Sequence, residues 1–351
     1  MMSSAETPID ATLIGTVPAP DRVEPLPEGR LAVWTDHRLE IHDRDAFLAG
    51  NGSPLHAQPL PPDASATPLP AGGLVAAETA RIRRIGPDGR DRWEVAHAPW
   101  HGSQWSSRPP GSPAVSPDGR HVSVVVPTLA AKGAPAVLVY DDAQKREYAR
   151  DTLLLLDAAT GEVLARRPIG AVASDVTQRW HPDGSLLALS CWTAWHSWST
   201  WWIEPRHDGL HIRGGAPMRE VIDFVPGASR VLTIRRAEGI APNDDRDELA
   251  SHEMASDDPH TLIDLGTLAV DPDNDEFSDA FLLDSAHVLV TGQIYLPGRP
   301  ATVRHWLCDA ATLKPLGRVR YPAPVGCEAV PLGDGSWLTR RGERMHHWAL
   351  P

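Results

Sequence analysis

The sequence predicts an all-β fold in which a unit of about four strands recurs along the 351 residues. One observation is the turn Ser116-Pro117-Asp118-Gly119, which joins two strand-like segments and returns as His181-Pro182-Asp183-Gly184. Another is that no long segment has the 3.6-residue period of a helix. The last is that the strand-like segment Thr12–Val17 precedes the first unit, whereas the last unit lacks one strand. We therefore predict a seven-bladed β-propeller, a ring closed by the N-terminal strand, which completes the last blade.

The whole chain is expected to form one propeller domain, residues 1–351. The blades are predicted at about 22–62, 66–100, 112–168, 174–214, 219–272, 278–322 and 327–350, with 11–18 as the closing strand. In the fifth unit we place the third strand at Thr261–Leu265 and leave the outer strand unassigned. Units of about 50 residues are within the range that propeller blades use.

The turn sequences resemble those of the WD-repeat and YVTN-type propeller superfamily. These families carry Ser-Pro-Asp-Gly between the first and second strands of a blade, as in Ser116–Gly119. They carry Asp-x-x-Thr-Gly before the outer strand, as in Asp157-Ala158-Ala159-Thr160-Gly161. Pro presets the first turn residue, Asp bonds the backbone, and Gly accepts a positive φ. The Trp-Asp dipeptide of eukaryotic WD repeats is absent, so the resemblance holds at the superfamily level.

Composition excludes several classes of partner. The net charge of −13 argues against nucleic acid and anionic membranes, which both require a cationic face. Cys191, Cys308 and Cys327 have neither zinc-site nor disulfide spacing, which favours a reducing compartment. No signal peptide or membrane span is evident, and the excess of Arg over Lys indicates a GC-rich bacterial genome. We expect a cytoplasmic monomer without cofactor or metal.

Four long segments interrupt the repeating pattern. Each joins either the second and third strands of one blade or one blade to the next, and both kinds of connection lie on the same face of a propeller. The segments are Ala98–Pro113, Pro127–Arg150, Cys191–Ser199 and Ala237–His260. Because binding residues concentrate in loops on a rigid scaffold, this face is where we expect function.

Two of these segments are rich in Trp and His. The candidate binding residues are Trp100, His101, Trp105, Trp192, Trp195, His196 and Trp198. In one interpretation they form an aromatic recess that holds a side chain of a protein partner, a cation or a sugar ring. In the other, the rings pack against each other and seal the junction between the third and fourth blades.

Two acidic segments have simpler interpretations. The segment from Asn243 to Asp258 is either a solvated loop or a contact for a basic partner. Asp271–Glu276 is similar to the start of a calcium loop, but Glu276 replaces the glycine and Leu282 the glutamate that such a loop needs. No metal site is predicted there.

The case for an enzyme is weak. The sequence contains neither His-Glu-x-x-His nor Gly-x-Ser-x-Gly, and His97, His101 and His196 are the histidines worth inspecting. Our first hypothesis is a non-catalytic scaffold that binds a protein through the long-loop face. The alternative is small-molecule or glycan binding, with hydrolase or oxidoreductase chemistry, at the central channel or the loop face. The fold alone supports neither, since propellers host both.

Overall fold

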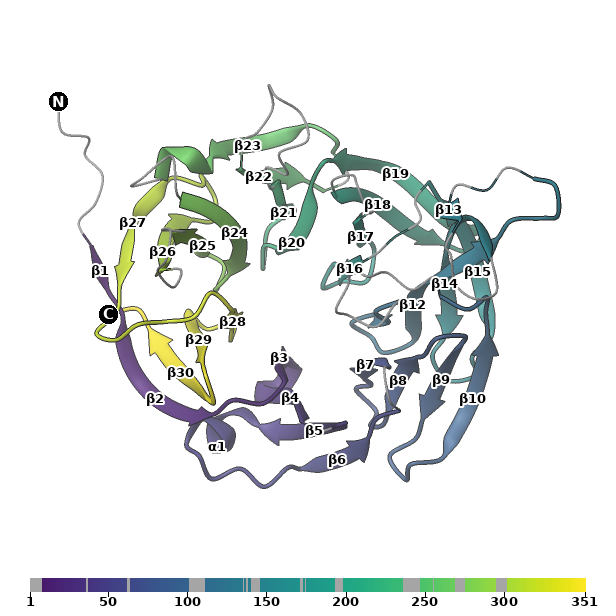
Figure 1. Ribbon diagram of the computed structural model, residues 1–351, viewed down its shortest axis with the longest axis horizontal. Coiled ribbons are helices and arrows are strands. Elements are labelled where there is room, and N and C mark those ends of the chain that lie inside the picture. The colour runs from purple at the N-terminus through teal and green to yellow at the C-terminus, as the bar shows by residue number, and fades with distance from the viewer. Residues whose placement is uncertain are drawn as a thin grey trace. The chain divides into compact units, whose positions relative to one another are not determined.

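The structure is a computed structural model of the chain. It describes residues 8–35, 37–61, 64–100, 111–134, 136, 138–139, 146–170, 173, 175–192, 198–235, 247–254, 256–268, 275–294 and 302–351. Strands dominate these residues and form seven sheets of four or five strands, which are numbered here as blades 1 to 7 in chain order (Figure 1). The fold is a seven-bladed β-propeller, as the sequence predicted.

The chain divides into two compact units, each considered by itself. Unit 1 contains residues 1–57, 222–254 and 258–351, and unit 2 contains residues 58–221 and 255–257. Blades 6 and 7 and most of blades 1 and 5 belong to unit 1, and blades 2, 3 and 4 belong to unit 2.

Unit 1 carries the following elements. Blade 1 has β3 (Arg22–Leu26), β4 (Arg30–Thr35), β5 (Arg38–Asp43) and β6 (His56–Pro59), with η1 (Pro27–Gly29) and α1 (Arg44–Leu48) between strands. Blade 5 has β20 (Glu220–Phe224), β21 (Arg230–Arg235), β22 (Glu248–Glu253) and β23 (Pro259–Asp264), followed by η2 (Leu265–Leu268). Blade 6 has β24 (Asp275–Leu282), β25 (His287–Ile294), β26 (Thr302–Asp309) and β27 (Pro315–Arg320). Blade 7 has β28 (Ala329–Pro331), β29 (Ser336–Arg341) and β30 (Arg344–Ala349).

The N-terminal segment completes blade 7, as predicted. β2 (Thr12–Pro18) pairs antiparallel with β30 and becomes the outer strand of that blade. A short strand that the sequence did not indicate, β1 (Ile9–Asp10), pairs in parallel with β27 of blade 6. The Arg320 Nη2 donates to Asp10 Oδ2 at 2.7 Å and holds this addition in place. The segment therefore bridges two neighbouring blades of unit 1.

Blade 5 differs from the prediction in one strand. The third strand is β22, inside the predicted loop Ala237–His260, and the predicted third strand is in fact the outer strand β23. The residues of β22 include Ser251 and His252, which hide its apolar character in the sequence. Both are buried, and His252 Nε2 lies 3.0 Å from Thr233 Oγ1 on the neighbouring strand. Because these polar side chains contact each other inside the sheet, a search of the sequence for hydrophobic residues does not find this strand.

Unit 2 carries three blades. Blade 2 has β7 (Ser65–Pro68), β8 (Leu74–Ala77), β9 (Arg81–Ile85) and β10 (Asp91–Ala96). Blade 3 has β11 (Ala114–Val115), β12 (His121–Leu129), β13 (Leu138–Val139), β14 (Glu147–Asp157) and β15 (Val163–Ile169). Blade 4 has β16 (Asp175–Trp180), β17 (Leu187–Trp192), β18 (Trp198–Arg206) and β19 (Gly209–Pro217). β12 and β14 extend into the predicted loop Pro127–Arg150, so this segment is partly strand.

The repeated turns are held by their own side chains. Asp118 Oδ1 accepts the Ser116 hydroxyl at 2.6 Å and the Arg120 N–H at 3.0 Å. These bonds, that from Ser116 above all, lower the pKa of Asp118 to about 2. Asp157 Oδ1 accepts the Thr160 N–H at 2.7 Å in the turn before the outer strand. The motifs that identify the fold are therefore structural.

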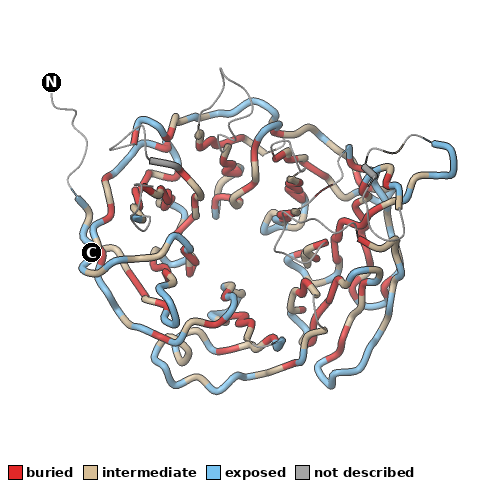
Figure 2. Tube along the Cα trace, viewed as in Figure 1, coloured by how far each residue is buried: buried red, intermediate tan, exposed pale blue. Residues whose placement is uncertain are grey.

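The core lies between the blades, on their middle strands. Figure 2 shows buried residues in long runs along the middle strands and exposed residues along the outer ones. Residues Leu187 to Cys191 of β17 are all buried, whereas most of β15 is exposed. A strand that is covered on both faces has a continuous run of hydrophobic residues rather than an alternation of hydrophobic and polar ones.

Candidate interaction surface

The described part of the candidate surface is centred on blade 4, where β16, β17 and β18 pair without a register shift between Asp175 and Ile203. Residues directly opposite each other in an antiparallel pair lie on the same face of the sheet. The register therefore assigns every side chain of these strands to one of two faces. The face that carries Cys191 is called here the cluster face, and the face that carries Trp192 the hydroxyl face.

The cluster face contributes to one hydrophobic core cluster. Val176, Leu187, Leu189, Cys191 and Ile203 of blade 4 belong to it. So do Val125 and Leu153 of blade 3, and Trp180 and Trp201 pack against it. Burial, with the nearby carboxylates of Asp151 and Asp175, raises the pKa of the Cys191 thiol well above its ordinary value. Cys191 is therefore a protonated core residue and not a nucleophile.

Trp100 belongs to the same cluster. It is 6% exposed, and its main-chain N–H donates to the Thr79 carbonyl at 2.8 Å. Pro99, which precedes Trp100, accepts a hydrogen bond at its carbonyl from the Tyr148 hydroxyl of β14 at 2.8 Å. Trp100 thus anchors the start of the segment that connects blades 2 and 3.

The hydroxyl face carries a chain of hydrogen bonds. Val221 N–H donates to Ser190 Oγ at 2.8 Å, and Ser190 Oγ lies 2.5 Å from Thr200 Oγ1. Thr200 Oγ1 donates to the Arg219 carbonyl at 2.7 Å. Because a carbonyl can only accept, the Ser190 hydroxyl must donate to Thr200, and every group in the chain is satisfied. The chain ties β17 and β18 to the connection between blades 4 and 5.

A row of three side chains lies above this chain, at the long-loop end of blade 4. Asp175 is directly opposite Trp192, and Trp192 is directly opposite Trp198. The three residues, called here the Asp–Trp–Trp row, lie on the hydroxyl face, two positions beyond Thr177, Ser190 and Thr200. Trp198 is 9% exposed, and Trp192 and Asp175 are half-buried. Asp175 and Trp192 of this row are described and partly open to solvent, whereas Trp198 is buried beside them.

The base of the hydroxyl face is closed by another segment. Trp202 is fully buried, and its Nε1 donates to the Ser256 carbonyl at 3.0 Å. Asp257 Oδ1 accepts the Gly215 N–H at 2.7 Å, and a Cβ on Gly214 would lie 1.8 Å from the same oxygen. Glycine is thus required for this close approach, which supports β18 and β19 from below.

The structure separates the predicted binding residues into groups. Trp100 lies in the cluster between blades 3 and 4, whereas Trp192 and Trp198 lie on the other face of blade 4. His101, Trp105, Trp195 and His196 lie outside the described residues, as do Asp271–Asn274 of the candidate calcium loop. Of the acidic segment, residues 243–246 and 255 lie outside, and β22 takes up most of the rest. Binding by these residues stays a prediction.

His97 is the one candidate histidine that the structure describes. Its Nδ1 lies 2.7 Å from the Ala98 carbonyl and donates to it, and burial lowers the pKa of the ring. The neutral ring thus holds the main chain ahead of Trp100. Among the described residues no group of three His, Cys, Asp or Glu side chains is placed to hold a metal ion.

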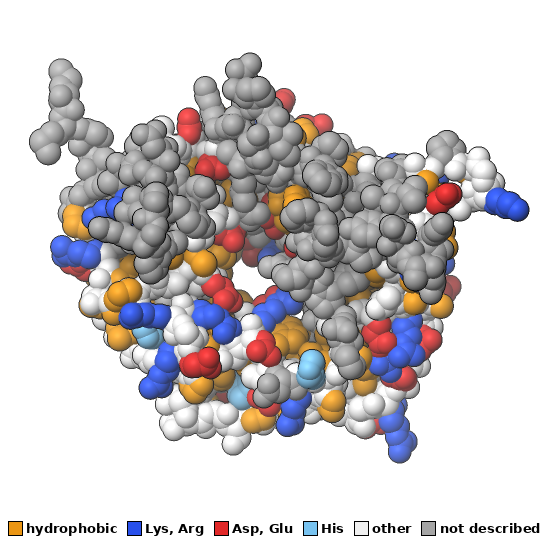
Figure 3. Space-filling view, viewed as in Figure 1, with side chains coloured by type: hydrophobic (Ala, Val, Ile, Leu, Met, Phe, Trp, Pro, Cys, Tyr) orange, Lys and Arg blue, Asp and Glu red, His pale blue; other side chains and the backbone are white. Residues whose placement is uncertain are grey.

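Charges on the described surface are mixed. In Figure 3 the described Arg and Lys side chains on one face lie among Asp and Glu side chains. Within the described segments, no helix is long and apolar enough to cross a membrane.

Sequence reasoning missed the residues that support the row. Asp175, Ser190, Thr200 and the connection through Arg219 and Glu220 were not singled out. Ser190 and Thr200 are each two residues from a candidate Trp, and the period of two in a strand places them on the same face. That spacing was the available signal. The pairing of β17 with β18 that joins them comes from the fold.

No protein-family model matches this sequence, and no curated protein matches it. Solved structures do. BBS1N, solved in complex with ARL6DN, has a TM-score of 0.53 and 11% identity, over 99% of this chain and 98% of that chain. The Neurospora crassa Pan2 WD40 domain has a TM-score of 0.51 and 11% identity, over 100% and 97%. Kuenenia stuttgartiensis hydrazine synthase has a TM-score of 0.50 and 10% identity, over 97% and 94%. At such identities the likeness shows the propeller fold alone.

Proposed function

We propose that this protein is a non-catalytic scaffold that binds a protein partner at the long-loop ends of its blades. The Asp–Trp–Trp row is the observation that carries the proposal. Trp192 and Trp198 are directly opposite each other at the ends of β17 and β18, on either side of residues 193–197, and Trp192 is half-buried. Large aromatic side chains held on a rigid base are typical of the residues that dominate protein interfaces.

The support beneath the row favours binding over simple packing. The Ser190–Thr200 chain fixes β17 and β18 against the connection to blade 5, and Trp202 fixes their lower part. A contact residue that is already ordered loses little conformational entropy when a partner binds. Trp100, with its main chain bonded to Thr79, is proposed as an anchor for the neighbouring loop, whose His101 and Trp105 are further proposed contacts.

The structural comparisons support this proposal at the level of the fold. One similar structure, BBS1N, was solved in complex with another protein, and another is a WD40 domain. The same fold is also found in hydrazine synthase. The proposal therefore depends on the Asp–Trp–Trp row and not on the fold.

The test is affinity capture with quantified partners. Tagged wild-type protein, Trp192→Ala and Trp192→Ala/Trp198→Ala are compared in a lysate of the source organism. We expect at least one specifically captured protein to fall about tenfold or more, since hot-spot truncation costs about 2 kcal/mol or more.

Leu164→Ala is the matched control. Leu164 is 45% exposed on β15, so its truncation removes exposed apolar surface of the same unit away from the row. Thermal unfolding of each variant shows that the fold is retained. Retention of every captured protein by a folded Trp192→Ala/Trp198→Ala variant would contradict the proposal.

A further inference from the structure

We infer that the Asp–Trp–Trp row holds a cationic side chain of the partner, arginine in preference to lysine. This inference rests on the proposed function and specifies the chemistry of the partner segment that docks there. It assigns distinct tasks to the three residues: the half-buried ring of Trp192 supplies the stacking surface, the buried ring of Trp198 lies next to it in the row, and Asp175 supplies the charge.

The geometry comes from the strand register. Asp175, Trp192 and Trp198 occupy successive cross-strand positions on three neighbouring strands, with no register shift among them. Directly opposite residues have Cβ atoms about 4.5–5.5 Å apart. A group that stacks on Trp192 is therefore within one cross-strand step of the Asp175 carboxylate. The Asp175 Oδ1 accepts the Val176 N–H at 2.8 Å, which fixes the side chain beside its own strand.

The charges around the row favour a cation. Asp151 is fully buried in the adjacent blade, where its Oδ2 accepts the Ala173 N–H at 2.7 Å. Asp151 acts on the Cys191 thiol, which lies on the cluster face, so its charge is behind the row and adds to that of Asp175 only over a longer distance. Glu220 lies below the row, where its Oε1 accepts the Thr177 hydroxyl at 2.8 Å. Arg219 is the cation on the same connection, and it is 8% exposed.

The whole-molecule charge acts in the same direction. A net charge of −13 attracts a basic segment over long range and repels an acidic one. At short range an aromatic face attracts a cation through its quadrupole, most strongly for Trp. A guanidinium is planar, stacks on an indole and can bond a carboxylate with its edge at the same time. An ammonium cannot stack in this way, which is the reason for the preference for arginine.

The experiment follows the indole N–H resonances of the intact ¹⁵N-labelled protein by NMR. Trp192→Phe and Trp198→Phe assign the two signals. The probe is a short blocked peptide of Gly and Arg, and the matched control is the same peptide with citrulline, which is neutral and nearly isosteric with arginine. We expect saturable shifts of both signals with the arginine peptide and about tenfold weaker binding of the citrulline peptide, consistent with a desolvated cation–π contact plus an ion pair.

Two charge variants separate the contributions. Asp175→Asn keeps the size of the side chain and should weaken binding of the arginine peptide about threefold to tenfold, as expected for the loss of one partly buried ion pair. Asp183→Asn removes the same charge from the exposed turn of the same blade and should change binding less than about twofold. The dispersion of the remaining indole signals reports that each variant is folded.

Three outcomes would overturn the inference. They are unmoved Trp192 and Trp198 signals at about 5 mM arginine peptide, equal binding of the citrulline peptide, and an Asp175→Asn variant as strong as wild type. If any of these occurred while partner capture still depended on Trp192, the charge assignment would be wrong and the proposed function would stand. If partner capture were also independent of Trp192, both would fail.

Discussion

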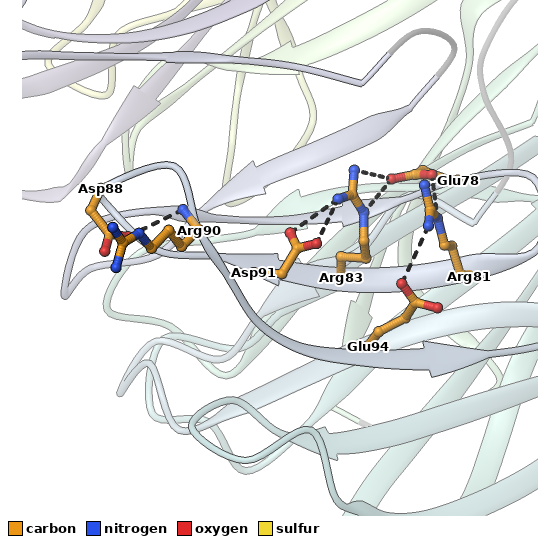
Figure 4. A network of polar contacts seen from close by, with 7 residues as sticks. All are labelled: Glu78, Arg81, Arg83, Asp88, Arg90, Asp91 and Glu94. Carbon is orange, nitrogen blue, oxygen red and sulfur yellow. Dashed lines mark hydrogen bonds and ion pairs between the residues drawn. The ribbon is translucent and has the colours of Figure 1, made fainter.

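Blades 2 and 4 belong to the same unit and have the same four-strand order, yet they use polar side chains in opposite ways. Blade 2 carries an ion network on β9, β10 and the turn before them (Figure 4). Arg81 Nε donates to Glu78 Oε2 at 2.7 Å, and Arg83 Nη1 donates to Asp91 Oδ2 at 2.9 Å. Glu94 adds a further contact to Arg81 at 3.3 Å.

Blade 4 has its polar chain inside and its aromatic rings at the end. Ser190 and Thr200 are buried and, within the described part of the chain, bond to one another and to the main chain of residues 219 and 221. This difference indicates which side chains of each blade are available to a binding partner. Arg81 and Arg83 of blade 2 already have carboxylate partners within the blade, so a ligand would have to displace those partners. Blade 4 keeps its hydroxyls satisfied and leaves Trp192 half-open, which is why the proposed contact residues lie there.

The largest expected effect is at the base of the hydroxyl face. Trp202→Ala should lower the free energy of unfolding by about 3–5 kcal/mol, because it removes a fully buried ring and leaves a cavity. Urea denaturation of Trp202→Ala and Trp192→Ala measures the contrast within blade 4. Trp192→Ala should lose less than about 1 kcal/mol, since a half-exposed ring transfers less area from water. Equal losses would mean that Trp192 contributes as much to the free energy of unfolding as Trp202 does.

An intermediate effect is expected in the hydroxyl chain. Ser190→Ala should cost about 1–3 kcal/mol of unfolding free energy, because the Val221 N–H loses its acceptor and Thr200 loses its donor in a buried site. The matched control is Ser199→Ala, since Ser199 is opposite Cys191 on the cluster face and is only half-buried. If the two variants unfolded at the same urea concentration, the chain would not be the support of the row.

The smallest effect is expected in the blade 2 network. Glu78→Gln weakens the contacts to Arg81 and Arg83 and should cost about 1 kcal/mol or less at low salt, with the difference shrinking at about 1 M NaCl. Glu94→Gln, whose carboxylate is 47% exposed, should cost less again. A salt-independent loss larger than that of Ser190→Ala would reverse the comparison between the two blades.

Much of the fold could be predicted because it depends on local chemistry. The Ser-Pro-Asp-Gly and Asp-x-x-Thr-Gly turns hold themselves together with their own side chains, so their sequences specify their structure. Apolar patterns in the sequence indicated most of the strands. The strand-like segment Thr12–Val17 had no blade of its own and was expected to complete the last blade, where it pairs with β30. The pattern failed at β22, where buried Ser251 and His252 look like loop residues. It also failed at β1, whose two residues are held by β27 and Arg320 from a distant part of the chain.

The sequence by itself determined the fold class, the number of blades and the segments where tryptophan gathers. Turn chemistry and strand periodicity act over a few residues, and the chain carries that information locally. Only the tertiary structure decided that Trp100 packs in the core cluster while Trp192 and Trp198 align with Asp175 on the other face of blade 4. The reason is physical: cross-strand register sets which side chains become neighbours, and register depends on pairing among strands that the sequence separates.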